Sequence, residues 1–127
     1  MYTFKKEERL CNKKLIDGLF HSGSSFLCYP FRVSWLLVDE AMPYPSQVMI
    51  VVPKKRYKRA VDRNLVKRRI REAFRLNKQQ HLYQQLDEAG KRIVFSINYV
   101  GKEILPSELI GKKMLKLLQQ LNSEVVK

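Results

Sequence analysis

The stretch that decides how this chain folds and what it contacts reads AVDRNLVKRRIREAFR, from Ala60 to Arg75. Its apolar residues recur at helical spacing, which predicts a helix from about Ala60 to Leu76. The residues expected to be buried are Val66, Ile70, Ala73 and Phe74. From Lys54 to Arg75, eleven Lys and Arg stand against two acidic residues, so this segment holds +9 of the formal +13 net charge.

The charge of this predicted helix gathers on one broad stripe. Arg63, Lys67 and Arg71 follow one another at i, i+4 and i+8, and Asn64, Arg68 and Arg75 lie beside them. Like charges at this spacing oppose helix formation, so the stripe indicates a polyanionic partner. Arginine fits phosphate with a planar fork, and an asparagine amide can contact a ribose hydroxyl or a base edge. The alternative is a solvated basic face without a specific partner.

The same residues resemble the signature of a known family, the protein subunit of bacterial ribonuclease P, which reads roughly Ala-Val-x-Arg-Asn-Arg-x-Lys-Arg-x-x-Arg-Glu. The matching residues are Ala60, Val61, Arg63, Asn64, Lys67, Arg68, Arg71 and Glu72. Two shorter stretches, FHSG at 20–23 and VVPKK at 51–55, are also similar to the family, and the resemblance covers about residues 9 to 121. One position departs from the pattern, because Leu65 stands at the family's middle arginine. We hypothesise that Arg69, one turn later, supplies the missing charge.

The resemblance implies two binding surfaces. The RNA-binding residues would be Lys54, Lys55, Arg59, Arg63, Asn64, Lys67, Arg68, Arg69, Arg71 and Arg75, with Arg56 and Lys58 in the same basic loop. A cleft between the first helix and the sheet would hold the single-stranded leader of precursor tRNA, lined by Ile16, Phe20, Arg32 and Ser34. Aromatic residues are common in the family at the positions of Ile16 and Ser34, so stacking is expected to be reduced here. Without the resemblance, helical spacing from Ile16 favours a core position for Phe20.

The resemblance also implies a division of labour. The chain would be a subunit of an endoribonuclease whose RNA carries out the magnesium-dependent removal of the 5′ leader. The expected partners are therefore the catalytic RNA and precursor tRNA, and we expect no stable protein partner. Magnesium would belong to the RNA-catalysed reaction, and no protein ligand is assigned to it.

The residues themselves offer no catalytic or metal-binding constellation. His21 and His81 are isolated, without cysteines or carboxylates at ligand spacing. Asp62 and Glu72 lie among arginines and are better interpreted as ion-pair partners. We therefore expect neither a catalytic residue nor a metal site in this chain.

Length and composition agree with a folded domain. A chain of 127 residues with 45% hydrophobic residues is predicted to form one domain over residues 1–127. Two cysteines, Cys11 and Cys28, indicate reduced thiols rather than a disulfide framework. No apolar signal region or membrane-length run is visible, so a cytoplasmic protein without a membrane role is expected.

The predicted fold class is α+β. The pattern indicates an α/β sandwich with a small mixed sheet in the order α-β-β-(β)-α-β-α, similar to ribosomal proteins. Asn12 is expected to cap the first helix and Gly23 to end it. Strands are predicted at 31–38, 47–52 (nearly all apolar, so central) and 92–100, with a loop at 40–46. A last helix, capped by Ser107, would bury Ile110, Met114, Leu117, Leu118, Leu121 and Val125. Crossovers are right-handed by rule, but the resemblance implies a left-handed one.

Two other classes of function remain open at this point. A structural RNA-binding protein of the ribosomal type would share the basic helix but need no leader cleft. A DNA-binding regulator would lay the helix in a major groove, but helix-turn-helix spacing and a dimerisation heptad are missing.

Overall fold

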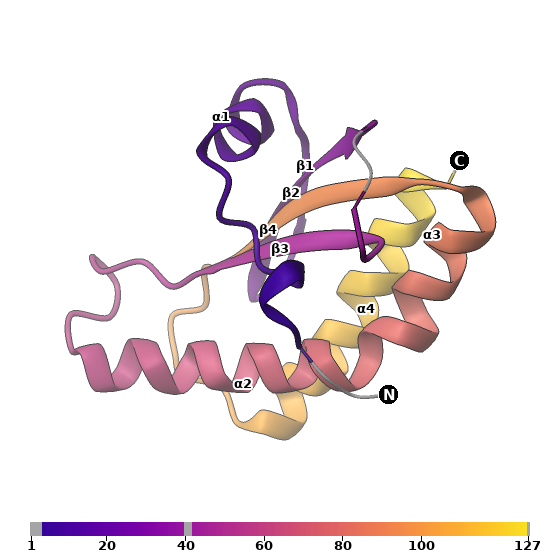
Figure 1. The fold of residues 1–127 in the computed structure, drawn as a ribbon. Coiled ribbons are helices and arrows are strands. Elements are labelled where there is room, and N and C mark those ends of the chain that lie inside the picture. The colour runs from indigo at the N-terminus through magenta and orange to yellow at the C-terminus, as the bar shows by residue number, and fades with distance from the viewer. Residues whose placement is uncertain (1–3, 40–41, 127) are drawn as a thin grey trace.

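The computed structural model describes residues 4–39 and 42–126, and its elements follow one another as the sequence predicts, with additions (Figure 1). The loop predicted at 40–46 lies partly outside these residues, at 40 and 41. The elements are a 3-10 turn η1 (Lys6–Glu8), α1 (Lys13–Ser22), β1 (Ser24–Cys28), β2 (Phe31–Val38), β3 (Ser46–Val51), α2 (Ala60–Lys78), a π-helical turn η2 (Gln79–Tyr83), α3 (Gln84–Ala89), β4 (Arg92–Tyr99) and α4 (Ser107–Val125).

The strands form one mixed sheet in the order β1-β2-β4-β3. Strand β2 is antiparallel to both β1 and β4, and β3 is parallel to β4. The predicted order left a third strand before α2 optional, and the structure has one, β1, which comes ahead of the two predicted strands. It pairs with β2 from Ser24 opposite Trp35 to Cys28 opposite Phe31. The α+β class with a small mixed sheet is confirmed.

The prediction that the apolar strand at 47–52 is central was wrong, because β3 lies at an edge and β4 lies between β2 and β3. A continuous apolar run indicates that both faces of a strand are buried, but it does not indicate whether the strand is central or at an edge of the sheet. Here α2 covers one face, and the segment before α1 runs along the outer edge. The Leu10 amide donates to the Val48 carbonyl over 2.9 Å, and Arg9 forms a bridge with Val48.

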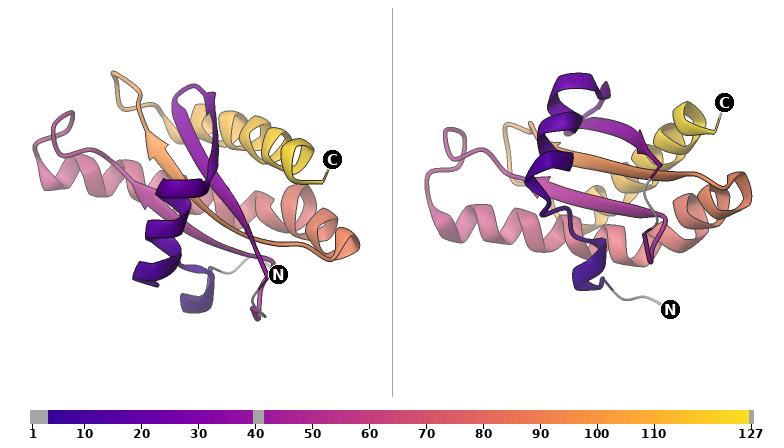
Figure 2. Two further views of the ribbon diagram at one scale, coloured as in Figure 1. Left: turned by 90° about the horizontal axis from the view of Figure 1, so that it is seen from above. Right: turned by 45° about the horizontal axis from the view of Figure 1, so that its top comes forward.

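The helices form layers on both faces of the sheet. Helix α1 lies on one face, and α2 and α4 lie on the other (Figure 1). In the right panel of Figure 2, α2 lies behind the sheet, β3 and β4 both run to the left, and β4 lies above β3. The β3–α2–β4 crossover is therefore left-handed, as the resemblance implied and against the general rule.

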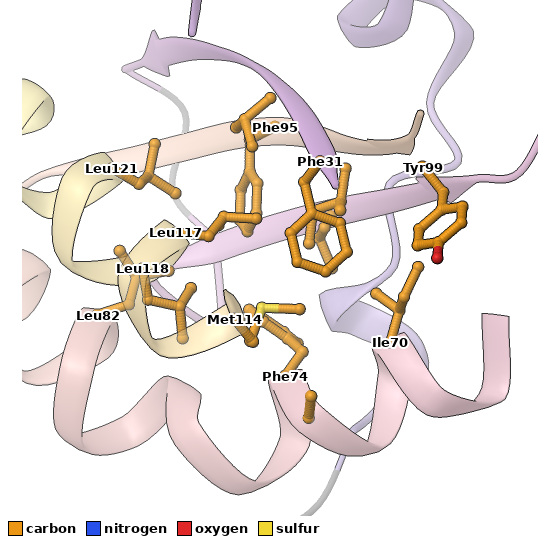
Figure 3. Close-up of a cluster of buried hydrophobic side chains, with 14 of the residues drawn as sticks. Phe31, Ile70, Phe74, Leu82, Phe95, Tyr99, Met114, Leu117, Leu118 and Leu121 are labelled. Atoms are coloured by element: carbon orange, nitrogen blue, oxygen red, sulfur yellow. The ribbon is translucent and has the colours of Figure 1, made fainter. Parts of the chain in front are cut away.

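The main core fills the space between the sheet and the layer of α2 and α4 (Figure 3). The apolar positions predicted for both helices are buried, as expected. Figure 3 shows Phe31, Phe95 and Tyr99 of the sheet facing Ile70 and Phe74 of α2. A second, smaller cluster joins Leu10, Leu19 and Val94 beneath α1.

The helix ends agree with two of three expectations. The Asn12 side chain accepts from the amides of Lys14 and Leu15, so it caps α1. Gly23 ends α1 in a crowded place, because an added Cβ would lie 2.3 Å from the Leu19 carbonyl oxygen. The Ser107 prediction was wrong, since Pro106 holds the cap position of α4 and Ser107 is its first helical residue. None of the described helices is long and apolar enough to span a membrane.

Candidate nucleic-acid interface

The outer face of α2 carries exposed polar and basic side chains above a buried apolar face. Asn64, Arg68 and Arg71 are exposed, and with Val61 and Leu65 they line a surface groove of about 510 Å³, called here the α2 groove. Lys67 flanks this face and is half-buried. Within residues 4–39 and 42–126, neither Arg68 nor Arg71 forms an ion pair. Their charges are therefore available to an anion.

Arg75, near the end of the stripe, is partly neutralised. It binds both carboxylate oxygens of Glu72, with its Nε 3.2 Å from Oε2. This hydrogen bonding lowers the pKa of Glu72 and raises the pKa of Arg75. A phosphate at Arg75 would have to compete with this carboxylate, so the contact is expected to be weaker than at Arg68.

Arg63 has a structural role at the start of α2. Its guanidinium donates to the carbonyl oxygens of Tyr57 at 2.8 Å and Lys58 at 2.7 Å. These bonds tie the basic loop to the first turn of the helix. Arg63 therefore positions the loop, and its remaining donors can still reach an anion.

Arg69 lies on the other flank of α2, away from the groove. It is half-buried and donates to the Leu105 carbonyl over 2.6 Å, joining α2 to the loop before α4. Leu65, in contrast, lines the groove. This geometry gives Arg69 a role in the fold. The hypothesis that Arg69 supplies the charge missing at Leu65 stays untested.

The basic loop between β3 and α2 is anchored to the body of the protein by one buried aromatic residue. Tyr57 is buried, and its hydroxyl donates to the Gly101 carbonyl over 2.7 Å while its ring lies 5.9 Å from that of Tyr99. Burial raises the pKa of Tyr57. The side chains around it, Lys54, Lys55, Arg56, Lys58 and Arg59, are all exposed. Sequence reasoning found these basic residues but missed the anchor, whose only trace was an aromatic residue inside a basic run.

The second surface lies on the sheet beside α1. Arg32 and Ser34 alternate along β2 with the buried Phe31 and Val33, so they face away from α2. Helix α1 covers part of this face, where Ile16 packs against the small buried cluster that includes Leu19 and Val94. It leaves a part uncovered, called here the open sheet face, which consists of Leu27, Arg32, Ser34 and Asn98.

Phe20 lies one helical turn beyond Ile16 on α1, the helix that packs on this side of the sheet (Figure 1). Phe20 is 56% exposed, so it does not occupy the core position that helical spacing alone favours. The structure thus brings Ile16, Phe20, Arg32 and Ser34 to the same side of the sheet. Whether they bind a leader stays a prediction.

Sequence reasoning missed two residues of the open sheet face. Asn98 pairs with Arg32 across the strands, and its amide donates to the Arg32 carbonyl and the Ser96 hydroxyl over 3.3 and 3.2 Å. Leu27 is 59% exposed opposite Arg32. The pattern of β4 did hold a sign, since Ser96 and Asn98 are polar residues at alternate positions of an otherwise apolar strand.

Outside these surfaces, titratable residues form ion pairs of Glu8 with Lys78 and of Asp87 with Arg92. In the described part of the chain, no group of three or more His, Cys, Asp or Glu could hold a metal ion. Cys11 is exposed and Cys28 half-buried, both as free thiols, and burial raises the pKa of Cys28.

Comparison with known proteins gives a consistent result. The family model described as Ribonuclease P matches residues 4–122. The ribonuclease P protein component of Porphyromonas gingivalis is 35% identical over 125 residues, which cover 98% of this chain and 90% of that protein. The RNase P protein structure from Thermotoga maritima superposes with a TM-score of 0.70 at 26% identity, over 89% of this chain and 96% of that one. The Staphylococcus aureus structure, at 22% identity and a TM-score of 0.67 over 94% and 98% of the two chains, shares the fold.

Proposed function

Because the chain belongs to the family of ribonuclease P proteins, we propose that it binds the catalytic RNA through the outer face of α2 and the leader of precursor tRNA through the open sheet face. As the protein component of this endoribonuclease, it acts in tRNA processing with an RNA partner, and the catalytic role lies with that RNA. The observation that carries the proposal is the exposed basic face of α2, with Arg68 and Arg71 unpaired among the described residues.

The outer face of α2 suits a folded RNA. Arg68 and Arg71 offer forks to phosphate oxygens, and Asn64, one helical turn before Arg68, offers both a donor and an acceptor to a ribose or a base edge. The exposed Lys54, Lys55 and Arg59 extend the positive surface beyond the first turn of the helix. Each phosphate that the protein neutralises releases counterions, so the affinity for RNA should decrease as the salt concentration rises.

The open sheet face suits a single strand. Phe20 offers a ring for one base, and Arg32 can meet a phosphate. Ser34 lacks the second ring, so affinity for the leader rests more on polar contacts. The Asn98 side chain lies beside Arg32 and offers an amide to a base edge.

Magnesium, in this proposal, is held by the RNA, where it would supply the activated water. The donor set of this chain gives no reason to assign a protein ligand, because its described carboxylates, thiols and imidazoles do not cluster. The chain's basic side chains reduce repulsion between RNA phosphates, so less magnesium is needed for the same fold and substrate affinity. A protein that works with an RNA partner in tRNA processing is expected in the cytoplasm, which is where we place this chain.

The test compares precursor tRNA carrying a leader with leaderless tRNA, each bound to the reconstituted holoenzyme. Phe20→Ala should weaken binding of the leader-bearing substrate about 5- to 150-fold, the equivalent of one stacked base, and leave leaderless tRNA unchanged. Ser34→Tyr should strengthen binding of the former. Leu109→Ala, at an exposed apolar position of α4, is the matched control. Equal effects of Phe20→Ala on both substrates would contradict leader binding at this face.

A further inference from the structure

The segment before α1 is fastened to the body of the protein by a buried ionic contact. Residues 4–10, called here the N-terminal strap, cross the edge strand β3 on the way to α1. Glu8 in the strap is fully buried, pairs with the Lys78 ammonium and accepts from the Tyr83 hydroxyl over 2.6 Å. The Leu10 amide also donates a hydrogen bond to the Val48 carbonyl of β3. The strap is therefore a fixed wall.

A notch of about 180 Å³ lies between the strap, β3 and α2. Its apolar lining includes Phe4 and Leu10 from the strap and Met49 and Ile50 from β3, and its two charged residues are Arg9 and Arg71. None of the described residues that line it is acidic. The Arg9 guanidinium carbon lies 5.3 Å from the centre of the Phe4 ring, so Arg9 is held over the notch while remaining exposed.

The notch continues the proposed RNA surface. Arg71 lines both the notch and the α2 groove, so a strand with a phosphate at Arg71 arrives at the mouth of the notch. An apolar cavity of about 150 Å³ is large enough for a benzene ring. The notch is therefore in the size range of a single base, with an arginine for the phosphate on either side.

We propose that this notch takes one unpaired nucleotide of the partner RNA, with the base against the apolar lining and the neighbouring phosphates at Arg9 and Arg71. The inference rests on the proposed contact of α2 with that RNA, and this contact selects the catalytic RNA over the leader as the source of the nucleotide. Strap, edge strand and α2 thereby form one site from three distant parts of the sequence.

Cys11 lines the notch and is exposed, so it can carry a photoreactive probe. In a Cys28→Ser background, an azidophenacyl group on Cys11 would be irradiated in the complex with the partner RNA and precursor tRNA. Crosslinks are expected at one unpaired nucleotide of the partner RNA. A probe on Ser123→Cys, exposed on α4, in a Cys11→Ser, Cys28→Ser chain should not mark that nucleotide. Crosslinks to the leader or to paired RNA would overturn the proposal, and so would the absence of any crosslink.

Binding measurements separate the notch from the rest of the surface. Arg9→Ala should weaken partner-RNA binding several-fold and reduce the slope of log affinity against log salt by about 1, the loss of one phosphate contact. Lys112→Ala, an equal charge change at an exposed site of α4, should leave both unchanged. If Arg68→Ala weakens binding but Arg9→Ala does not, only the notch proposal fails. If both are silent, the proposed contact of α2 with RNA fails as well.

Discussion

Arginines that look alike in the sequence of α2 have different surroundings in the structure. Arg68 and Arg71 line an open groove, whereas Arg63 binds two loop carbonyls and Arg69 binds Leu105. Helical periodicity assigns a direction to each side chain, but it does not reveal which backbone carbonyl is within reach. The sequence places Arg63 with Arg68 among the expected RNA-binding residues, and the structure adds a role in the fold for Arg63 alone of the two.

Arg69 and Arg68 should respond differently to replacement. Arg69→Leu is expected to lower the melting temperature by several degrees, because it leaves the half-buried Leu105 carbonyl without its charged donor, a loss of about 1.5–3 kcal/mol. RNA affinity should stay close to that of the native chain. Arg68→Ala should do the reverse, weakening RNA binding without lowering the melting temperature. Calorimetry and filter binding on both variants check this.

The opposite result for Arg69 would support the hypothesis taken from the sequence. In that case Arg69→Leu would weaken RNA binding at unchanged stability, and adding Leu65→Arg would restore it.

At the scale of the elements, the regular parts of α2 and α4 could be predicted and the strap could not. Both helices repeat apolar residues at helical spacing over 19 residues, and the structure buries those residues. The strap has no such pattern. Its Glu8 reads as one more surface charge, although it meets Lys78 at a separation of 70 positions. The short β1 was hard to predict because its burial alternates only weakly.

The buried pair Glu8 and Lys78 should be essential to the strap. Glu8→Gln removes the carboxylate charge that faces the buried Lys78 ammonium, so we expect a loss of about 3–5 kcal/mol in the free energy of unfolding. Combining it with Lys78→Met, which removes the second charge but keeps the volume, should recover most of this loss. Urea titrations of the single and double variants measure it, and a change below about 0.5 kcal/mol for Glu8→Gln would show that the pair is dispensable.

Tyr83 gives the same cluster a dependence on alkaline pH. Burial, above all, and the hydrogen bond to Glu8 raise the pKa of Tyr83 far above its ordinary value of 10.0. The folded state therefore keeps a proton that the unfolded chain loses near pH 10, so this contribution to stability is complete below that pH and falls as the pH rises above it. Tyr83→Phe should be less stable than the native chain at pH 8, and the difference should shrink by pH 11. Denaturant titrations across this range check it, and a constant difference would contradict the assignment.

At the scale of the whole molecule, the edge position of β3 links the two proposed surfaces. Helices α1 and α2 lie on opposite sides of the sheet, and the strap crosses the edge between them (Figure 1). The α2 groove is on the α2 side, and the open sheet face is on the α1 side. The motif at 60–72, together with two shorter similar stretches, was enough to predict the family, and the order of the predicted elements gave the α+β class. Strand order and the notch could not be predicted, because each depends on contacts between segments that show no pattern in common.

The magnesium dependence of precursor tRNA cleavage tests the central claim, that α2 binds the RNA partner and assists its reaction. Cleavage by the partner RNA would be followed over magnesium concentration at limiting protein, with the native chain and with the Arg68→Ala, Arg71→Ala double variant. The native chain should lower the magnesium requirement, RNA-free protein should not cleave, and the double variant should need more magnesium or more protein while melting at the native temperature. A folded double variant that lowers the magnesium requirement as well as the native chain at limiting protein would contradict the claim.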